Sequence, residues 1–295
     1  MLLLNASGCL DALTAPEVAR ALDAFVTKTV TPEPRDGNAP VRIAETDVGM
    51  LNSIGLANPG IDRFLTRNLP ALAKLEVPLW VSVGGFAAEE YADICSRLDD
   101  HAEVTAIELN VSCPNVDSPA ESAAQIVASA RLATRKPVWA KLSPAVPDIA
   151  EVARAAQAAG ANGLSLINTV RGMTLDATTL RPALGPGSGG LSGPALKPIA
   201  LSAVYACYRA TGLPIVGMGG VTSGRDVLEF VAAGARHVAL GTVLFADPDA
   251  PARVRAELDA ELAARDYADV DAAYAKAHAE SLSTTTTKAE KALLK

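Results

Sequence analysis

Residues 110–115, Asn-Val-Ser-Cys-Pro-Asn, combine the side chains best suited to chemistry in this sequence. Cys113 follows an apolar run and lies between two asparagines, whose amides offer a paired donor and acceptor to a flat imide ring. None of the 3 histidines is placed beside it by the sequence pattern. The segment therefore predicts a cysteine that removes a proton from a carbon acid, rather than one that attacks an acyl group. A lone cysteine is more commonly inert core filler, so this interpretation depends on what gathers around Cys113.

Other polar or glycine residues also occur where apolar runs end. Residues 215–223 and the pair Gly241-Thr242 resemble a phosphate site, because glycine lets backbone N–H groups approach an anion and a helix N-terminus adds its positive dipole end. A Gly-Gly pair alone is equally consistent with a tight turn. The polar and glycine residues that stand at the ends of apolar runs are Ser7, Lys28, Thr29, Asn110, Lys141, Asn168, Thr169, Gly219, Gly220, Gly241 and Thr242.

Lys28 and Lys141 each close an apolar run. Such a lysine is often only a solvated cap. Facing a bound flavin, a cation near its N1–C2=O edge would instead stabilise the anionic reduced form. His237, in contrast, begins an apolar run, which predicts a structural role at the opposite end of the fold.

Short apolar runs alternate with stretches of helical periodicity along the whole chain. Alternation of this kind implies parallel strands with right-handed crossovers, and eight such units close into a (β/α)8 TIM barrel whose site lies at the strand C-termini. An open doubly wound sheet is the structural alternative. The predicted strands are residues 2–6, 25–29, 79–83, 106–111, 138–142, 163–168, 214–218 and 237–241, and the predicted helices include residues 15–25, 61–75, 121–133, 149–159, 198–210 and 225–233.

Two connections are too long to be simple turns. Residues 30–78 and 169–193 follow the second and sixth predicted strands and are rich in Gly and Pro. Long loops inside a compact domain are usually functional. We expect one barrel domain over residues 1–265, followed by a helical, frayed tail over residues 266–295.

Composition narrows the class of protein. The net charge of −7 disfavours a nucleic-acid-binding surface. No apolar run approaches the length of about 18–20 residues that spans a bilayer. The 4 cysteines lack the spacing of a disulfide framework or a zinc site. We expect a cytoplasmic α/β enzyme without a metal site.

The order and spacing of these motifs resemble the dihydroorotate dehydrogenases of class 1, over about residues 2–250. Cys113 is similar to that class, since class 2 members carry serine there. Within class 1, residues 33–38, 42–46, 49–56 and 168–173 resemble the NAD-linked 1B catalytic subunit more than the fumarate-linked 1A form. The segments that carry the family resemblance are residues 6–8, 26–29, 52–56, 108–115, 141–144, 167–169, 192–194, 219–221 and 241–242.

The resemblance implies oxidation of dihydroorotate to orotate in pyrimidine biosynthesis. Cys113 would take the C5 proton while a hydride leaves C6 for N5 of FMN. It also implies a homodimer, or a heterotetramer with a separate electron-transfer subunit that carries FAD and an iron–sulfur cluster. Implied FMN-binding residues are Ser7, Lys28, Thr29, Ser82, Asn110, Lys141, Ile167, Gly193, Gly219, Gly220, Gly241 and Thr242. Implied dihydroorotate-binding residues are Lys28, Asn52, Ser53, Ile54, Gly55, Leu56, Asn110, Asn168 and Thr169.

The match departs from the family at two places. Ser82 stands where the family usually has an asparagine that contacts FMN, and the connection after Asn115 is shorter than usual. Two further functions stay open: another FMN barrel acting on a dihydropyrimidine, and a phosphate-binding barrel without a redox cofactor. A non-catalytic scaffold makes no use of so many polar strand ends on one rim.

Overall fold

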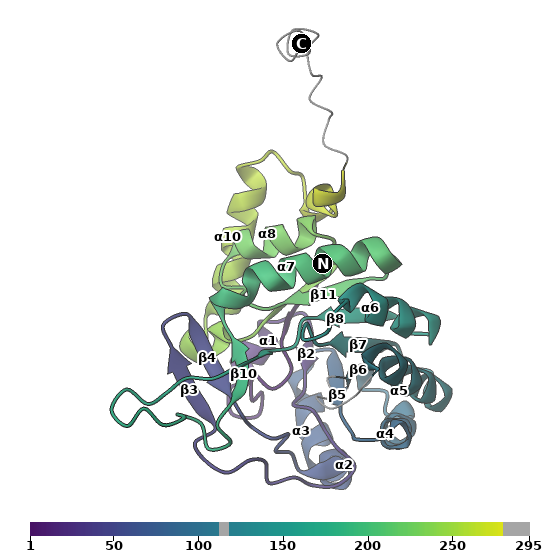
Figure 1. Cartoon of the computed structure of the whole chain (residues 1–295). Helices are drawn as coiled ribbons and strands as arrows, with labels where there is room; N and C mark the ends of the chain where they lie inside the picture. The colour runs from purple at the N-terminus through teal and green to yellow at the C-terminus, as the bar shows by residue number, and fades with distance from the viewer. Residues whose placement is uncertain (112–117, 280–295) are drawn as a thin grey trace, which may run out of the picture.

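Eight parallel strands form a closed barrel at the centre of the molecule (Figure 1). The computed structural model describes residues 1–111 and 118–279. The hydrogen-bonded order is β1-β12-β11-β8-β7-β6-β5-β2, and a parallel bridge between Leu4 and Ala24 brings β1 beside β2. The predicted (β/α)8 barrel is therefore confirmed. The strands are β1 (Leu3–Asn5), β2 (Phe25–Val26), β5 (Leu79–Val83), β6 (Val104–Asn110), β7 (Val138–Leu142), β8 (Gly163–Leu166), β11 (Ile215–Met218) and β12 (His237–Leu240).

Helices surround the barrel, and their apolar faces form the larger core against the outer faces of the strands. Helix α7 ends at Gly212, whose left-handed backbone (φ 64°) closes the last turn. In the part of the chain that the structure describes, no helix has the length and apolar character needed to cross a membrane. The main helices are α1 (Pro16–Arg20), α4 (Ala88–Asp99), α5 (Pro119–Ala133), α6 (Ile149–Ala158), α7 (Lys197–Thr211), α8 (Gly224–Ala232), α9 (Val243–Ala246) and α10 (Ala250–Ala263).

The inside of the barrel has an apolar floor and a polar upper layer. Trp80 and Trp139 form the floor, with ring centroids 4.9 Å apart, within a second core cluster of inward-facing residues. Side chains alternate between the two faces of a strand, so Ser82, Glu108 and Lys141, each two residues beyond an inward-facing position, also point inward. All three are buried. This polar layer lies at the C-terminal ends of the strands.

The two long connections build a second sheet. Figure 1 shows β3, β4 and β10 side by side, outside the barrel strands. The sheet is antiparallel with the order β3-β4-β10-β9, and it joins segments that lie far apart in the sequence: Leu51 of β4 pairs with Leu191 of β10. The sequence predicted only long functional loops here. The strands are β3 (Ile43–Thr46), β4 (Gly49–Asn52), β9 (Val170–Gly172) and β10 (Gly189–Ser192).

Two predicted helices are wrong in extent. The helix expected over residues 15–25 covers only α1, because the chain must turn to begin β2. The helix expected over residues 61–75 is broken into four pieces. Pro70 has no N–H to donate, and Leu69 N donates instead to Phe64 O, five residues back. The pieces are α2 (Gly60–Arg63), the π-helical turn η1 (Phe64–Asn68), α3 (Leu69–Leu72) and the 3-10 turn η2 (Ala73–Leu75).

The described part of the tail, which the sequence suggested as a helix with a frayed end, contains short helical turns. It forms two 3-10 turns, η4 (Val270–Ala273) and η5 (Lys276–His278), separated by Ala275 in a left-handed conformation. The segment packs on α8, where Ala275 N donates to Val231 O at 3.0 Å. Residues 280–295 lie outside the described residues, and the division at residue 265 stays a prediction.

His237 has the structural role expected of it, at the N-terminal end of β12. Its Nδ1 accepts a hydrogen bond from Leu2 N at 3.1 Å, which links β1 to β12. Burial, followed by the charges of the N-terminal amine and Arg236, lowers the pKa of His237 to about 4. The folded protein therefore keeps this ring neutral at pH values where the unfolded chain is protonated.

This pKa predicts a loss of stability in mild acid. A lowered folded-state pKa contributes stability that is complete above about pH 6.5 and is lost as the pH falls towards about 4. After a discount for partial exposure we expect a loss of about 2 kcal/mol. Urea unfolding between these pH values measures it. His237→Asn keeps an acceptor for Leu2 N without a titrating ring, so its unfolding free energy should depend less on pH; an unchanged dependence would contradict this assignment.

Candidate active site

One cavity of about 700 Å³ lies at the C-terminal rim of the barrel, between the strand ends and the second sheet. Its size is that of a site for a cofactor or small ligand. Of the sequence-predicted site residues that the structure describes, all line it except Ser82; Cys113 lies outside the described residues. Those that line it are Ser7, Lys28, Thr29, Asn52, Ser53, Ile54, Gly55, Leu56, Asn110, Lys141, Ile167, Asn168, Thr169, Gly193, Gly219, Gly220, Gly241 and Thr242.

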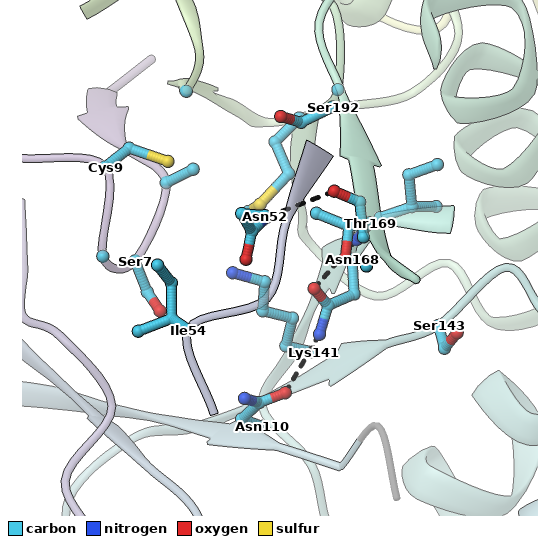
Figure 2. A pocket seen from close by; sticks show the side chains of 18 of the residues that line it. Ser7, Cys9, Asn52, Ile54, Asn110, Lys141, Ser143, Asn168, Thr169 and Ser192 are labelled. Atoms are coloured by element: carbon cyan, nitrogen blue, oxygen red, sulfur yellow. Dashed lines mark hydrogen bonds between the residues drawn. The ribbon is translucent and has the colours of Figure 1, made fainter. Parts of the chain in front are cut away.

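Two asparagine amides are held together on the cavity wall. Asn168 Nδ2 donates to Asn110 Oδ1 at 3.0 Å, and Thr169 N donates to Asn168 Oδ1 at 2.8 Å (Figure 2). The hydroxyl of Tyr91 donates to the Asn110 carbonyl at 2.8 Å. The first two bonds orient the side-chain amides, whereas the Tyr91 bond holds the backbone carbonyl oxygen of Asn110. Amides oriented in this way suit a planar ring with alternating donors and acceptors.

Lys28 and Lys141 bring two cations to the same cavity. Burial lowers the pKa of Lys28, and the charge of Lys141 adds to this shift. Gly8 makes room for Lys28, since a Cβ at Gly8 would lie 3.0 Å from Lys28 Cδ. Lys141 Nζ lies 3.5 Å from Glu108 Oε1 below the cavity. This region therefore suits a ligand that carries or acquires negative charge.

The glycine turn after β11 has the backbone that a close-approach site requires. Gly219 and Gly220 have φ values of +118° and +79°. A Cβ on Gly220 would lie 2.8 Å from Lys197 N and 2.9 Å from Gly193 O, so the turn is tightly packed. Thr242 Oγ1 donates to Ser192 Oγ at 2.9 Å, which brings the second sheet to the same place.

The predicted contribution of a helix N-terminus to this anion site stays a prediction, but several N–H groups at the start of α8 are used within the protein. Thr222 N and Ser223 N both donate to Asp226 Oδ2, at 2.8 and 3.0 Å. Gly224 N donates to Glu257 Oε2 at 2.9 Å. These N–H groups at the start of α8 already have carboxylate partners. The glycine turn itself, Gly241 and Thr242 stay candidate donors for an anion.

The comparisons with known proteins agree with this geometry. The family model described as dihydroorotate dehydrogenase matches residues 2–262, which is most of the chain. The chain belongs to the dihydroorotate dehydrogenase family. Members of this family are flavin-dependent in general, and the cavity, with its glycine turn and its lysines, fits a flavin.

Curated dihydroorotate dehydrogenases resemble the chain over most of their length. A protein from Desulforudis audaxviator is 47% identical over 265 residues, covering 87% of this chain and 86% of the relative, and one from Geobacter sulfurreducens is 46% identical, covering 85% and 84%. Both are named catalytic subunits of the NAD-linked B type. A relative from Solibacter usitatus, 46% identical over 81% of each chain, is provisionally named a fumarate-linked A type.

A solved dihydroorotate dehydrogenase shares the fold. The crystal structure of the Eimeria tenella enzyme in complex with ferulenol has a TM-score of 0.78 and 22% sequence identity, and the match covers 94% of this chain and 85% of that one. At this identity the likeness shows the barrel architecture alone.

Ser82, where this chain departs from the dihydroorotate dehydrogenase pattern, supports the site from behind. Its hydroxyl lies 3.0 Å from that of Thr29, which in turn lies 3.5 Å from that of Ser7. Ser82 N donates to Thr27 Oγ1. Ser82 is fully buried and does not line the cavity. Its hydroxyl is therefore placed to hydrogen-bond Thr29, not to contact a ligand.

The described cysteines are poor bases. Cys113 lies in residues 112–117, outside the described residues. Burial raises the pKa of Cys95 and of Cys207 to about 12. Cys9 lines the cavity, but burial raises its pKa too, against the opposing charges of Lys141 and Lys28. None of these three thiols is therefore a ready thiolate at neutral pH.

Sequence reasoning missed several residues that line the cavity, among them Cys9, Asn38, Arg171 and Ser192. Asn38 and Ser192 stand inside segments that carried the family resemblance, so a closer position-by-position comparison would have found them. Arg171 also stands in such a segment, residues 168–173, and it lies on β9, which pairs with β10. The pairing of β9 with β10 cannot be predicted from the local sequence.

Proposed function

We propose that this chain binds FMN and oxidises dihydroorotate to orotate in pyrimidine biosynthesis. One observation carries the proposal: a single cavity joins the glycine turn, the two lysines and the Asn110–Asn168 amide pair. Family membership supports the same activity. The alternatives left open by the sequence, a different dihydropyrimidine oxidoreductase or a non-redox barrel enzyme, have no comparable support from the comparisons.

The cofactor's proposed position follows from the chemistry of the donors. Gly219, Gly220, Gly241 and Thr242 would hold the FMN phosphate through backbone N–H groups and one hydroxyl. Lys141 would face the flavin ring, where its charge stabilises the electron-rich reduced form. FMN supplies the acceptor for the hydride.

The proposed position of the substrate depends on other residues of the cavity than those proposed for the cofactor. Dihydroorotate carries a carboxylate, which Lys28 would pair, and a flat ring with amide groups, which Asn110 and Asn168 would hydrogen-bond. Residues 52–56 line the same cavity from the end of β4. Cys113 is the proposed base: its thiolate takes the C5 proton while the hydride leaves C6, so the substrate loses two electrons and two hydrogens and gains a double bond.

The proposed final acceptor is NAD, reached through a separate electron-transfer subunit with FAD and an iron–sulfur cluster. The name catalytic subunit carried by two of the relatives supports such a partner. The Solibacter relative supports fumarate as the second candidate. Assembly as a homodimer or heterotetramer, and location in the cytoplasm, stay predictions.

A reductive titration tests this function. The purified protein should show the visible absorbance of bound FMN, and dihydroorotate added without oxygen should bleach it. The reduced protein should then be reoxidised by fumarate if it is of the A type, and by NAD only with the partner subunit if it is of the B type. A colourless protein with no affinity for FMN would overturn the cofactor assignment. A flavin that chemical reductants bleach but dihydroorotate does not would overturn the substrate.

A further inference from the structure

A buried carboxylate lies directly below the proposed flavin site. Glu108, on β6, points into the barrel two residues before Asn110 and does not itself line the cavity. Its side chain is 2% exposed, and the side chain of Lys141, its ion-pair partner, is 7% exposed. Burying two charges is costly unless they satisfy each other, so the pair needs an explanation.

Among the described residues, one carboxylate oxygen of Glu108 has no hydrogen-bond partner. Glu108 Oε1 lies 3.5 Å from Lys141 Nζ and accepts no hydrogen bond from the residues that the structure describes. Asp226 provides the contrast, because it accepts bonds from Thr222 and Ser223 and pairs with Lys197 Nζ at 2.7 Å. Asp226 therefore stabilises the loop that precedes α8. Glu108 instead supplies a negative charge to one lysine that faces the cavity.

The charges around the cavity show what this carboxylate does. Lys28 and Lys141 both line the cavity, and the charge of Lys141 contributes to the lowered pKa of Lys28. Without Glu108, two lysines would act on the ligand with no buried counter-charge beside Lys141. Inside a protein of low effective dielectric, such a charge acts over several ångströms.

We propose that Glu108 is a positioning residue that holds Lys141 and sets the reduction potential of the bound flavin. This inference rests on the proposed FMN function. Two uncompensated cations would stabilise the anionic reduced flavin strongly and hinder the release of its electrons. Glu108 offsets part of this stabilisation, so the reduced flavin can pass electrons to the next acceptor.

The test is the flavin midpoint potential of Glu108→Gln, measured against a reference dye with a chemical reductant. Gln has nearly the same shape and no charge. We expect a shift to more positive potential, and each tenfold gain in the preference for reduced flavin corresponds to about 30 mV for a two-electron couple. Reoxidation by the physiological acceptor should slow, although dihydroorotate should still reduce the flavin.

Three further variants separate this charge effect from a packing effect. Ser165→Ala removes another buried polar side chain, on the strand beside Lys141, without changing charge, and should leave the potential unchanged. Glu108→Asp keeps the charge and should restore most of the wild-type potential, whereas Lys141→Gln should shift it in the negative direction. Should Glu108→Gln not fold, Glu108→Met provides a second uncharged side chain with the same expected sign.

An unchanged or more negative potential in the uncharged Glu108 variants would overturn the proposal. Equal shifts in Glu108→Gln and Ser165→Ala would do so too, because they would indicate a packing effect. The chemical reductant keeps this test independent of the substrate. A wild-type protein that binds FMN but ignores dihydroorotate would refute the proposed function and leave the electrostatic result interpretable.

Discussion

Replacing Cys113 by alanine should slow reduction of the bound flavin by dihydroorotate by about 10²–10⁴-fold, the usual contribution of a positioned base. FMN should stay bound, because the proposed phosphate and ring contacts come from other residues. Stopped-flow measurement of flavin bleaching at neutral pH gives the rate directly. The expectation combines the sequence argument, in which no histidine accompanies Cys113, with the raised pKa of each described cysteine.

Cys9→Ala is the matched control for that variant. Cys9 lines the same cavity, but its pKa is raised by burial, so it is not a thiolate that could replace Cys113. We expect Cys9→Ala to reduce its flavin at close to the wild-type rate. Near-normal reduction by Cys113→Ala, or an equal loss in Cys9→Ala, would remove Cys113 from its proposed role. Cys113→Ser should lie between, because a hydroxyl is a weaker base at neutral pH.

The barrel could be predicted because its strands are short runs of mainly apolar residues. Strands buried on both faces carry such runs, and β5, β7 and β8 are buried along their whole length. The second sheet could not be predicted in this way. Residues Gly189 and Gly190 of β10 have no side chains to form a pattern, and its partner β4 lies more than a hundred residues away in the sequence.

The residues of the site could be predicted from the sequence, but the hydrogen bonds and contacts between them could not. In a parallel barrel all strand C-termini meet at one rim, so Lys28, Lys141 and Gly220 had to converge. Contacts between segments that lie far apart in the sequence follow no such rule and leave no pattern in the sequence. Glu257 closes the start of α8 from 33 residues away, and the burial of Ser82 behind Thr29 depends on the neighbouring strand.

Replacing Gly220 by alanine should abolish practical FMN binding, with a loss of at least about 100-fold in affinity. Its φ of +79° costs a residue with a Cβ about 1–2 kcal/mol. The Cβ would also lie 2.8 Å from Lys197 N and 2.9 Å from Gly193 O, both backbone atoms that cannot simply rotate away. The turn must shift, and with it the N–H groups proposed to hold the phosphate. Each factor of ten corresponds to about 1.4 kcal/mol, so a combined cost of about 3 kcal/mol suffices. Quenching of FMN fluorescence by the apoprotein measures the affinity.

Gly212→Ala separates loss of the site from loss of the fold. Gly212 has a similar left-handed backbone, with φ +64°, but among the described residues no atom beyond its chain neighbours lies within 4 Å of the position its Cβ would take. It ends α7 and does not line the cavity. Both variants should lower the thermal unfolding midpoint modestly through the shared backbone strain, while only Gly220→Ala should lose FMN. Because the strain is nearly matched, any difference in FMN affinity reports the crowding of the turn after β11. Equal affinities in the two variants would place the phosphate elsewhere in the cavity.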